Sequence, residues 1–240
     1  MKTVYSLVAA FLLIGLVGSG VKAQKTAKPW TEWSEREAKN MLEDSAWVRT
    51  QSNEENLNRA ALSTLPSSLD RLNWDRFGLM AVMNSKISIR LLSAQPIRQA
   101  FARLVELKQK NPSPDLKQQL QTFVDRKFDD WIVVAVDYEP GQNGDPAFLR
   151  KAFADATTNS LKNTTYLAAK GGKRLTLQDY KAPINDGLGA KFIFPRTLDG
   201  KPFVTADSGE LHFYTEMATF IRVNVRFKVT QMMHNGTLEY

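Results

Sequence analysis

The amino-acid sequence predicts an α+β fold, in which N-terminal helices pack on a mostly antiparallel sheet formed largely by the C-terminal third. Three observations predict this class. Segments with helical periodicity concentrate before residue 160, and segments with strand alternation concentrate after it. Short turn pairs, such as Gly171-Gly172 and Asn235-Gly236, separate the later segments as hairpin turns do.

The composition excludes several classes of protein. The chain has 240 residues, 43% hydrophobic and 24% charged, which argues against a disordered chain and a multi-span membrane protein. It contains no Cys, so disulfides, thiolate metal sites and a cysteine nucleophile are excluded. The net charge is a modest +7 and no long block of like charges occurs, so we expect no nucleic-acid partner.

Residues 1–23 have the pattern of a secretory signal peptide. Lys2 precedes an uncharged apolar run over residues 7–17, and Val21-Lys22-Ala23 fits the small-residue cleavage rule. A membrane-spanning helix needs about 20 apolar residues, and this run is shorter. We therefore expect cleavage near Ala23, a secreted or periplasmic protein, and no integral membrane span after cleavage.

Residues 24–85 are expected to form a lead-in to the globular core at 86–240, both within a single domain. A short helix is predicted from Ser34 to Glu43, because Ser34 and Glu37 have the spacing of a capping box. Residues 48–75 are polar and weakly periodic, which indicates a long irregular segment.

Three helices are predicted in the middle of the chain. One begins at Pro96 and carries an apolar face at 3.6-residue spacing. A second begins at Ser113-Pro114, as the cap and the first helical residue, and a third follows Pro146.

The predicted strands differ in their patterns. Apolar residues alternate with polar ones from residue 86 to 91 and from 221 to 229, as in strands with one buried face. The run from Trp131 to Val136 is almost continuously apolar, so we expect a central strand buried on both faces, with Trp131 in the core. Further strands are predicted at 164–169, 174–177, 191–194, 211–214 and 237–240.

Two carboxylates and a histidine are candidates for catalysis. Asp137 and Glu139 stand two residues apart at the end of the central strand, so they share a face and could act as an acid and base pair in a hydrolase. His212 lies close to Asp207 and Ser208, but no nucleophile-elbow pattern surrounds them. The favoured alternative is that the carboxylates simply leave the core and that His212 faces solvent.

Four tryptophans stand beside polar residues and are candidates for ligand binding: Trp30, Trp33, Trp47 and Trp74. Aromatic side chains with polar neighbours are typical of surfaces that contact proteins, peptides or carbohydrates. The alternative is that Trp33 and Trp47 clamp the first helix onto the core.

Metal and cofactor motifs are missing from the sequence. It contains no HExxH, no calcium-binding loop and no phosphate loop, since Gly171-Gly172 lies between predicted strands. We therefore expect neither a metal nor a cofactor.

Three segments resemble a group of secreted bacterial proteins of acidobacterial type. The residues that carry the resemblance are W-T-E-W-S at 30–34 with D-S-A-W at 44–47, the segment 89–100, and the tail 225–240. Leu91-Leu92 departs from the more polar or aromatic pair expected there. The resemblance implies an exported protein and carries over no catalytic residues.

Together these observations predict an exported, non-catalytic binding or envelope-associated module with a protein, peptide or carbohydrate partner. The alternative is a secreted hydrolase that uses Asp137 and Glu139.

Overall fold

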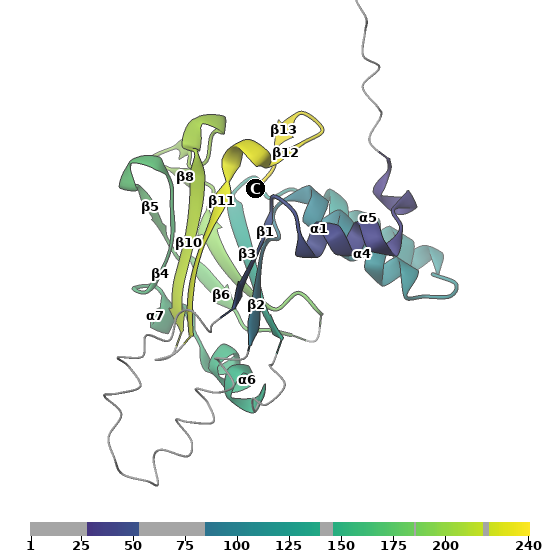
Figure 1. Cartoon of the computed structure of the whole chain (residues 1–240), viewed down its shortest axis with the longest axis horizontal. Helices are drawn as coiled ribbons and strands as arrows, with labels where there is room; N and C mark the ends of the chain where they lie inside the picture. Colours follow the sequence, from purple (N-terminus) through teal and green to yellow (C-terminus); the bar gives the residue numbers. More distant parts are fainter. Residues whose placement is uncertain (1–27, 53–84, 140–145, 185, 218–220) are drawn as a thin grey trace, which may run out of the picture.

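The computed structural model describes residues 28–52, 85–139, 146–184, 186–217 and 221–240. The α+β class is confirmed: two antiparallel sheets pack face to face, and a layer of helices covers the outer face of one of them (Figure 1). The expected signal peptide at 1–23 and Trp74 lie outside the described residues.

The five-stranded sheet has the order β1-β2-β3-β7-β6, with every neighbouring pair antiparallel. Its central strand β3 has five consecutive buried residues, as the apolar run predicted. The strands are β1 (Val48–Ser52), β2 (Lys86–Leu91), β3 (Trp131–Glu139), β6 (Asp179–Lys181) and β7 (Ala190–Pro195).

The four-stranded sheet has the order β11-β10-β4-β5 and comes entirely from the C-terminal part of the chain. Side chains of β11 alternate strictly between buried and exposed, which confirms the predicted alternation. The strands are β4 (Thr165–Ala168), β5 (Arg174–Thr176), β10 (Glu210–Met217) and β11 (Ile221–Lys228). Two small hairpins pair β8 (Thr197–Leu198) with β9 (Lys201–Pro202) and β12 (Met233–His234) with β13 (Thr237–Leu238).

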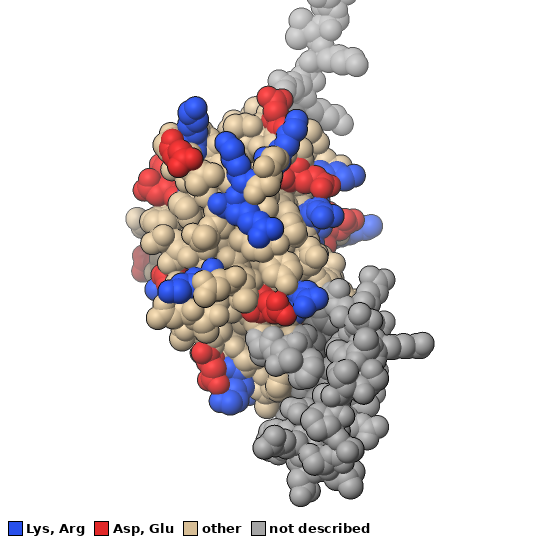
Figure 2. Space-filling view, turned by 90° about the vertical axis from the view of Figure 1, so that its left-hand side faces the viewer, with Lys and Arg blue, Asp and Glu red and all other residues tan. Residues whose placement is uncertain are grey.

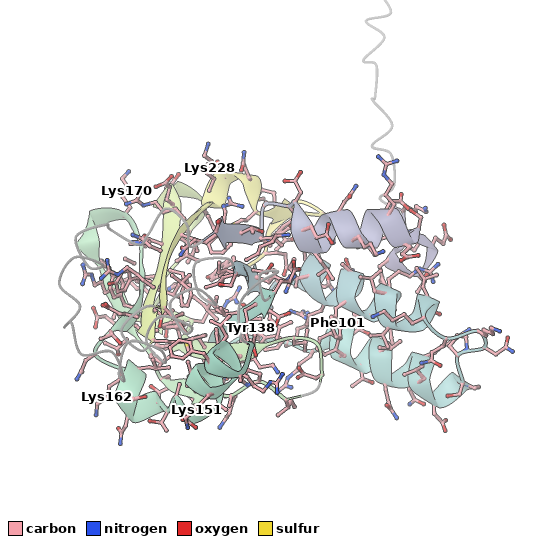
Figure 3. All side chains as sticks on the ribbon, turned by 60° about the horizontal axis from the view of Figure 1, so that its bottom comes forward. Phe101, Tyr138, Lys151, Lys162, Lys170 and Lys228 are labelled. Carbon is pink, nitrogen blue, oxygen red and sulfur yellow. The ribbon has the colours of Figure 1, made fainter. Side chains whose placement is uncertain are left out.

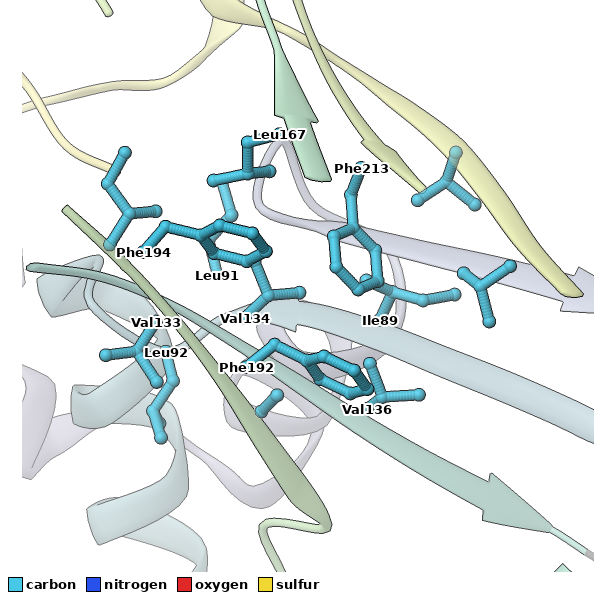
Figure 4. Close-up of a cluster of buried hydrophobic side chains, with 14 of the residues drawn as sticks. Ile89, Leu91, Leu92, Val133, Val134, Val136, Leu167, Phe192, Phe194 and Phe213 are labelled. Atoms are coloured by element: carbon cyan, nitrogen blue, oxygen red, sulfur yellow. The ribbon is translucent and has the colours of Figure 1, made fainter. Parts of the chain in front are cut away.

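The main core fills the space between the two sheets. Phe213 of β10 meets Phe192 and Phe194 of β7 edge to face, with ring centroids 5.4 and 6.2 Å apart. Figure 4 shows Ile89 and Val134 in the same layer. These fully buried side chains join the sheets into one hydrophobic unit.

Both edges of the two sheets are also linked. At one edge the side-chain amide of Gln51 on β1 donates to the Arg222 carbonyl at 2.6 Å and accepts from the Asn224 N–H of β11 at 2.9 Å. At the other edge the chain passes from β5 to β6, and the Gln178 N–H donates to the Ile193 carbonyl of β7. The sandwich is therefore close to a flattened barrel.

The helical layer consists of α1 (Glu35–Glu43), α4 (Gln95–Leu107) and α5 (Pro114–Asp125). The predicted caps form: the Ser34 Oγ accepts from the Glu37 N–H, the Glu37 carboxylate accepts from the Ser34 N–H, and Ser113 caps α5. Arg98 of α4 is buried and donates to four main-chain carbonyls, which fixes α4 against the segments around it. The helices α6 (Pro146–Asp155) and α7 (Thr158–Leu161) lie at one end of the sandwich (Figure 1).

Two predictions are corrected. Trp131 is 40% exposed, not in the core, because it is the first residue of β3 and alternation there directs it away from the packed interior. Residues 48–52 form strand β1, although they belong to the segment predicted as irregular, because pairing with β2 and the contacts of Gln51 outweigh their polar composition. In the described part of the chain, no helix has the length and apolar content needed to cross a membrane.

Candidate functional site

A cavity of about 410 Å³ lies between the helical layer and the outer face of the five-stranded sheet. Its walls are mainly apolar and its floor carries charged groups, which is the usual make-up of a small-molecule site. It is lined by Leu42, Arg90, Leu92, Ile97, Phe101, Leu104, Val105, Lys108, Ala135, Asp137, Asp186, Gly187 and Leu188.

The floor of the cavity is built by strand alternation. The side chains of β3 that point into the barrel fill the core, and the residues between them face the helices. Ala135 and Asp137 therefore face the cavity from β3, and Arg90 faces it from β2, where it pairs in register with Ala135. The methyl group of Ala135 leaves the room that a larger side chain would fill.

Arg90 and Asp137 form the polar centre of the floor. The Arg90 Nε donates to the Leu42 carbonyl at 3.0 Å, at the C-terminal end of α1, and its Nη1 lies 3.9 Å from the Asp137 Oδ2. That separation is too long for a hydrogen bond. Within the described residues, the Nη groups of Arg90 have no hydrogen-bond acceptor, so they remain available to a ligand.

Burial disfavours the charged forms of both groups. It raises the pKa of Asp137 above its usual value, although the Tyr138 N–H and the charge of Arg90 act in the opposite direction. Burial also lowers the pKa of Arg90, although a guanidinium stays charged at neutral pH. The two side chains thus face each other at the bottom of an apolar cavity without forming a hydrogen bond.

A short loop closes one side of the cavity. The Asp186 carboxylate accepts from the Leu188 N–H at 2.9 Å and pairs with Lys191. Gly189 then brings the chain directly onto β3, with φ +74° and a backbone so close that a Cβ would lie 2.3 Å from the Val136 carbonyl oxygen. This glycine holds Leu188 against the end of β3.

The apolar wall opposite the sheet comes mainly from one face of α4. Ile97, Phe101 and Leu104 recur at helical spacing and project toward the sheet. Figure 3 places Phe101 where the helical layer meets the rest of the molecule. The Phe101 ring also packs edge to face on Phe123 of α5, which fixes its position.

No family model, curated protein or solved structure matches this chain.

The three candidate catalytic residues are not brought together. Asp137 lines the cavity, whereas Glu139 is exposed at the end of β3, 4.0 Å from the Lys86 ammonium. His212 lies on the other sheet, where its Nε2 is 2.6 Å from the Asn224 Oδ1. Asp207 and Ser208 belong to a short 3₁₀ turn and make no hydrogen bond to His212 in the described part of the chain.

Of the candidate tryptophans, Trp30 and Trp33 lie together at the 3₁₀ turn before α1, whereas Trp47 lies apart from them at the start of β1. Trp30 is half-buried against the apolar cluster between α4 and α5, and the Trp33 Nε1 donates to the Lys28 carbonyl. Trp47 is 5% exposed, and its Nε1 donates to the Glu239 carbonyl at 2.7 Å. Trp47 therefore offers no contact surface, which corrects its assignment to ligand binding; its side chain contacts Glu239 and His234 in the C-terminal segment.

The sequence reasoning missed Arg90 and gave no binding role to Asp186. Arg90 had one detectable signal, because it is a charged residue within a strand whose neighbours are buried. The contribution of Asp186 depends on a loop that folds back over β3, which no local pattern indicates. Among the described residues, no group of three or more His, Asp or Glu side chains could hold a metal ion.

Proposed function

We propose that this protein is a non-catalytic binding module that takes an apolar side chain and its adjoining amide group, as in a peptide, into the cavity beneath α4. The observation that carries the proposal is the incompletely satisfied pair Arg90 and Asp137, 3.9 Å apart on the floor of a cavity with apolar walls.

An amide fits this floor better than a charged group does. A carbonyl oxygen can accept from the free Nη groups of Arg90, and an amide N–H can donate to the Asp137 carboxylate. A ligand carboxylate would be attracted by Arg90 but repelled by Asp137, and an ammonium would meet the reverse, so neither ion satisfies both residues. A neutral group that both accepts and donates satisfies both residues without adding charge to a partly buried site.

The apolar wall supplies room for a side chain such as that of Leu or Phe. A volume of about 410 Å³ is within the range of pockets that bind small molecules. Burial of such a side chain against Ile97, Phe101 and Leu104 is worth about 2 kcal/mol. The apolar contact supplies affinity, and the polar floor orients the amide.

The hydrolase alternative has less support. Of its two carboxylates only Asp137 reaches the cavity, and no described hydroxyl nucleophile or histidine lines it. The export of the protein is part of the proposal, supported by the signal-peptide pattern of residues 1–23 and by the resemblance to secreted bacterial proteins.

The test is titration of the isotope-labelled protein with N-acetyl-leucine N-methylamide, monitored by nuclear magnetic resonance. We expect a dissociation constant of about 1 mM for so small a ligand, with the largest shifts at the amides of Ala135 and Asp137. The methyl ester analogue lacks the C-terminal N–H, keeps only the acetamide N–H as a donor, and should bind more weakly. The glycine analogue lacks the apolar side chain and should not bind measurably.

Two variants locate the binding. Ala135→Met fills the floor of the cavity and should abolish the shifts, whereas Arg174→Met, on the far sheet, should leave them unchanged. Equal affinity for the amide and the ester would contradict a hydrogen bond from the C-terminal N–H to Asp137, and binding that survives Ala135→Met would place the ligand elsewhere.

A further inference from the structure

The outer face of the four-stranded sheet carries a second hollow, remote from the cavity under α4. Its base consists of small residues, Ala168 and Ala169 from the end of β4 and Gly209 from the turn before β10. Lys170, His212 and Arg226 stand around it, together with Ser208 and with Glu210, whose carboxylate lies 3.8 Å from the Arg226 guanidinium. Small residues below polar side chains leave space for a ring-sized polar group to approach the sheet closely.

This face has an excess of positive charge. Glu216 pairs with Arg222 at 3.1 Å, and Glu210 lies 3.8 Å from Arg226. Within the described residues, no carboxylate lies within 4 Å of the cationic groups of Lys170, Arg174 or Lys228. Figure 2 shows Lys and Arg side chains over the upper half of this face with Asp and Glu side chains among them, and Figure 3 shows Lys170 and Lys228 extending from the same end of the sheet.

The aromatic side chains on this face are already stacked. The Tyr166 ring stacks on that of Tyr214, with centroids 5.1 Å apart, and the Arg174 guanidinium lies 4.1 Å from the Tyr166 centroid. Because β4 lies between β5 and β10, these neighbours cover opposite faces of the Tyr166 ring. Nucleic-acid bases bind to free ring faces, so a covered ring does not favour such a partner.

The remaining groups suit a different kind of polymer. They are cations, the His212 imidazole with its Asn224 partner, and the Tyr166 hydroxyl, since the Tyr214 hydroxyl donates to the Glu216 carboxylate. Such groups bind carboxylates and hydroxyls together. We propose that the outer face of the four-stranded sheet binds an acidic polysaccharide, with one uronic-acid unit in the hollow between Lys170 and Arg226 and the chain continuing toward Lys228.

The experiment measures binding of polygalacturonate to the full chain by biolayer interferometry at several salt concentrations. We expect affinity that falls as salt increases, because cations contact the carboxylates. Lys170→Gln with Lys228→Gln should weaken binding about tenfold. The matched control, Lys110→Gln with Lys117→Gln, removes the same charge from exposed lysines of the α4–α5 loop and of α5, and should change affinity less than about twofold.

Each of three results would overturn the proposal. The first is no binding of polygalacturonate at low salt. The second is equal weakening by both pairs of substitutions, which would show attraction by net charge alone. The third is equal competition by a single-stranded oligothymidylate, added at the same concentration of negative charge as polygalacturonate. That result would favour a nucleic-acid partner. Circular dichroism of both double variants checks that their fold is unchanged.

Discussion

At the scale of single residues, a glycine determines how the loop beside the cavity meets the sheet. Gly189 combines a positive φ with an approach to β3 that leaves no room for a Cβ. Gly200 has almost the same φ, +72°, but nothing lies within 4 Å of the position of its Cβ. Comparing substitutions at these two glycines therefore distinguishes the cost of a positive φ from the cost of a steric clash.

We predict that Gly189→Ala destabilises the protein considerably more than Gly200→Ala does. The Gly200 change costs only the strain of a positive φ, about 1 kcal/mol. The Gly189 change adds a clash with the Val136 carbonyl and should cost about 3 kcal/mol or more. Urea unfolding of both variants measures the difference, and equal losses of stability would show that β3 yields to the added methyl group.

His234 couples stability to pH. Its ring meets Trp47 edge to face at 6.2 Å, and within the described residues its buried Nε2 has no hydrogen-bond partner. Burial lowers the pKa of His234, and the charge of Glu239 opposes this only in part. The unfolded chain therefore binds the proton more tightly than the folded protein does.

From this we predict that the stability contributed by neutral His234 is fully present above pH 6.5 and decreases as the pH falls through that value. His234→Phe retains the aromatic contact and should show a smaller loss of stability between pH 7.5 and 5. Urea midpoints across this range provide the measurement, and identical slopes for wild type and His234→Phe would contradict the assignment.

At the scale of elements, caps and alternation account for what the sequence predicted correctly. Helices α1 and α5 begin at Ser34 and Ser113 because each hydroxyl accepts from a first-turn N–H, which is a local interaction. Strand β11 follows its period of two because one face packs on the core. Strand β1 was missed because its stability depends on partners far along the chain, and Gln51 itself contacts β11.

The cap of α1 provides a prediction at this scale. Ser34→Ala should lower the free energy of unfolding by about 1 kcal/mol, because the Glu37 N–H loses its acceptor. Ser34→Gly should lower the free energy of unfolding by only a few tenths of a kcal/mol, because water can reach the uncovered N–H beside a glycine. Denaturant unfolding distinguishes the two, and no loss in Ser34→Ala would show that the first turn contributes nothing to global stability.

At the scale of the whole molecule, the candidate site arises from long-range packing. Asp137 was identified from its place at the end of an apolar strand, but its partner was expected to be Glu139. Two residues on one strand face share a side of the sheet, yet α4 covers only part of that side and leaves Glu139 in solvent. Arg90 reaches the cavity because β2 and β3 are neighbours in the sheet, a pairing that local periodicity does not specify.

The closure of the sandwich gives a last prediction, at the edge where β1 meets β11. Here the Gln51 amide takes the place of strand pairing, with one bond donated to Arg222 and one accepted from Asn224. Gln51→Ala removes both and leaves partly buried backbone groups without partners, so it should cost about 2 kcal/mol. Thr50→Ala, at the exposed neighbouring position, should cost less than about 1 kcal/mol.

Hydrogen exchange locates this effect. In Gln51→Ala the Asn224 amide should exchange much faster than in the wild type, whereas amides of β3 should change only in line with the loss of global stability. Unchanged protection of Asn224 would mean that the Gln51 amide is not needed to hold this edge closed, where Arg49 also donates to the Arg226 carbonyl. If protection is lost at Asn224 while Phe192 and Phe213 remain packed, the core and the edge contribute separately to closing the barrel.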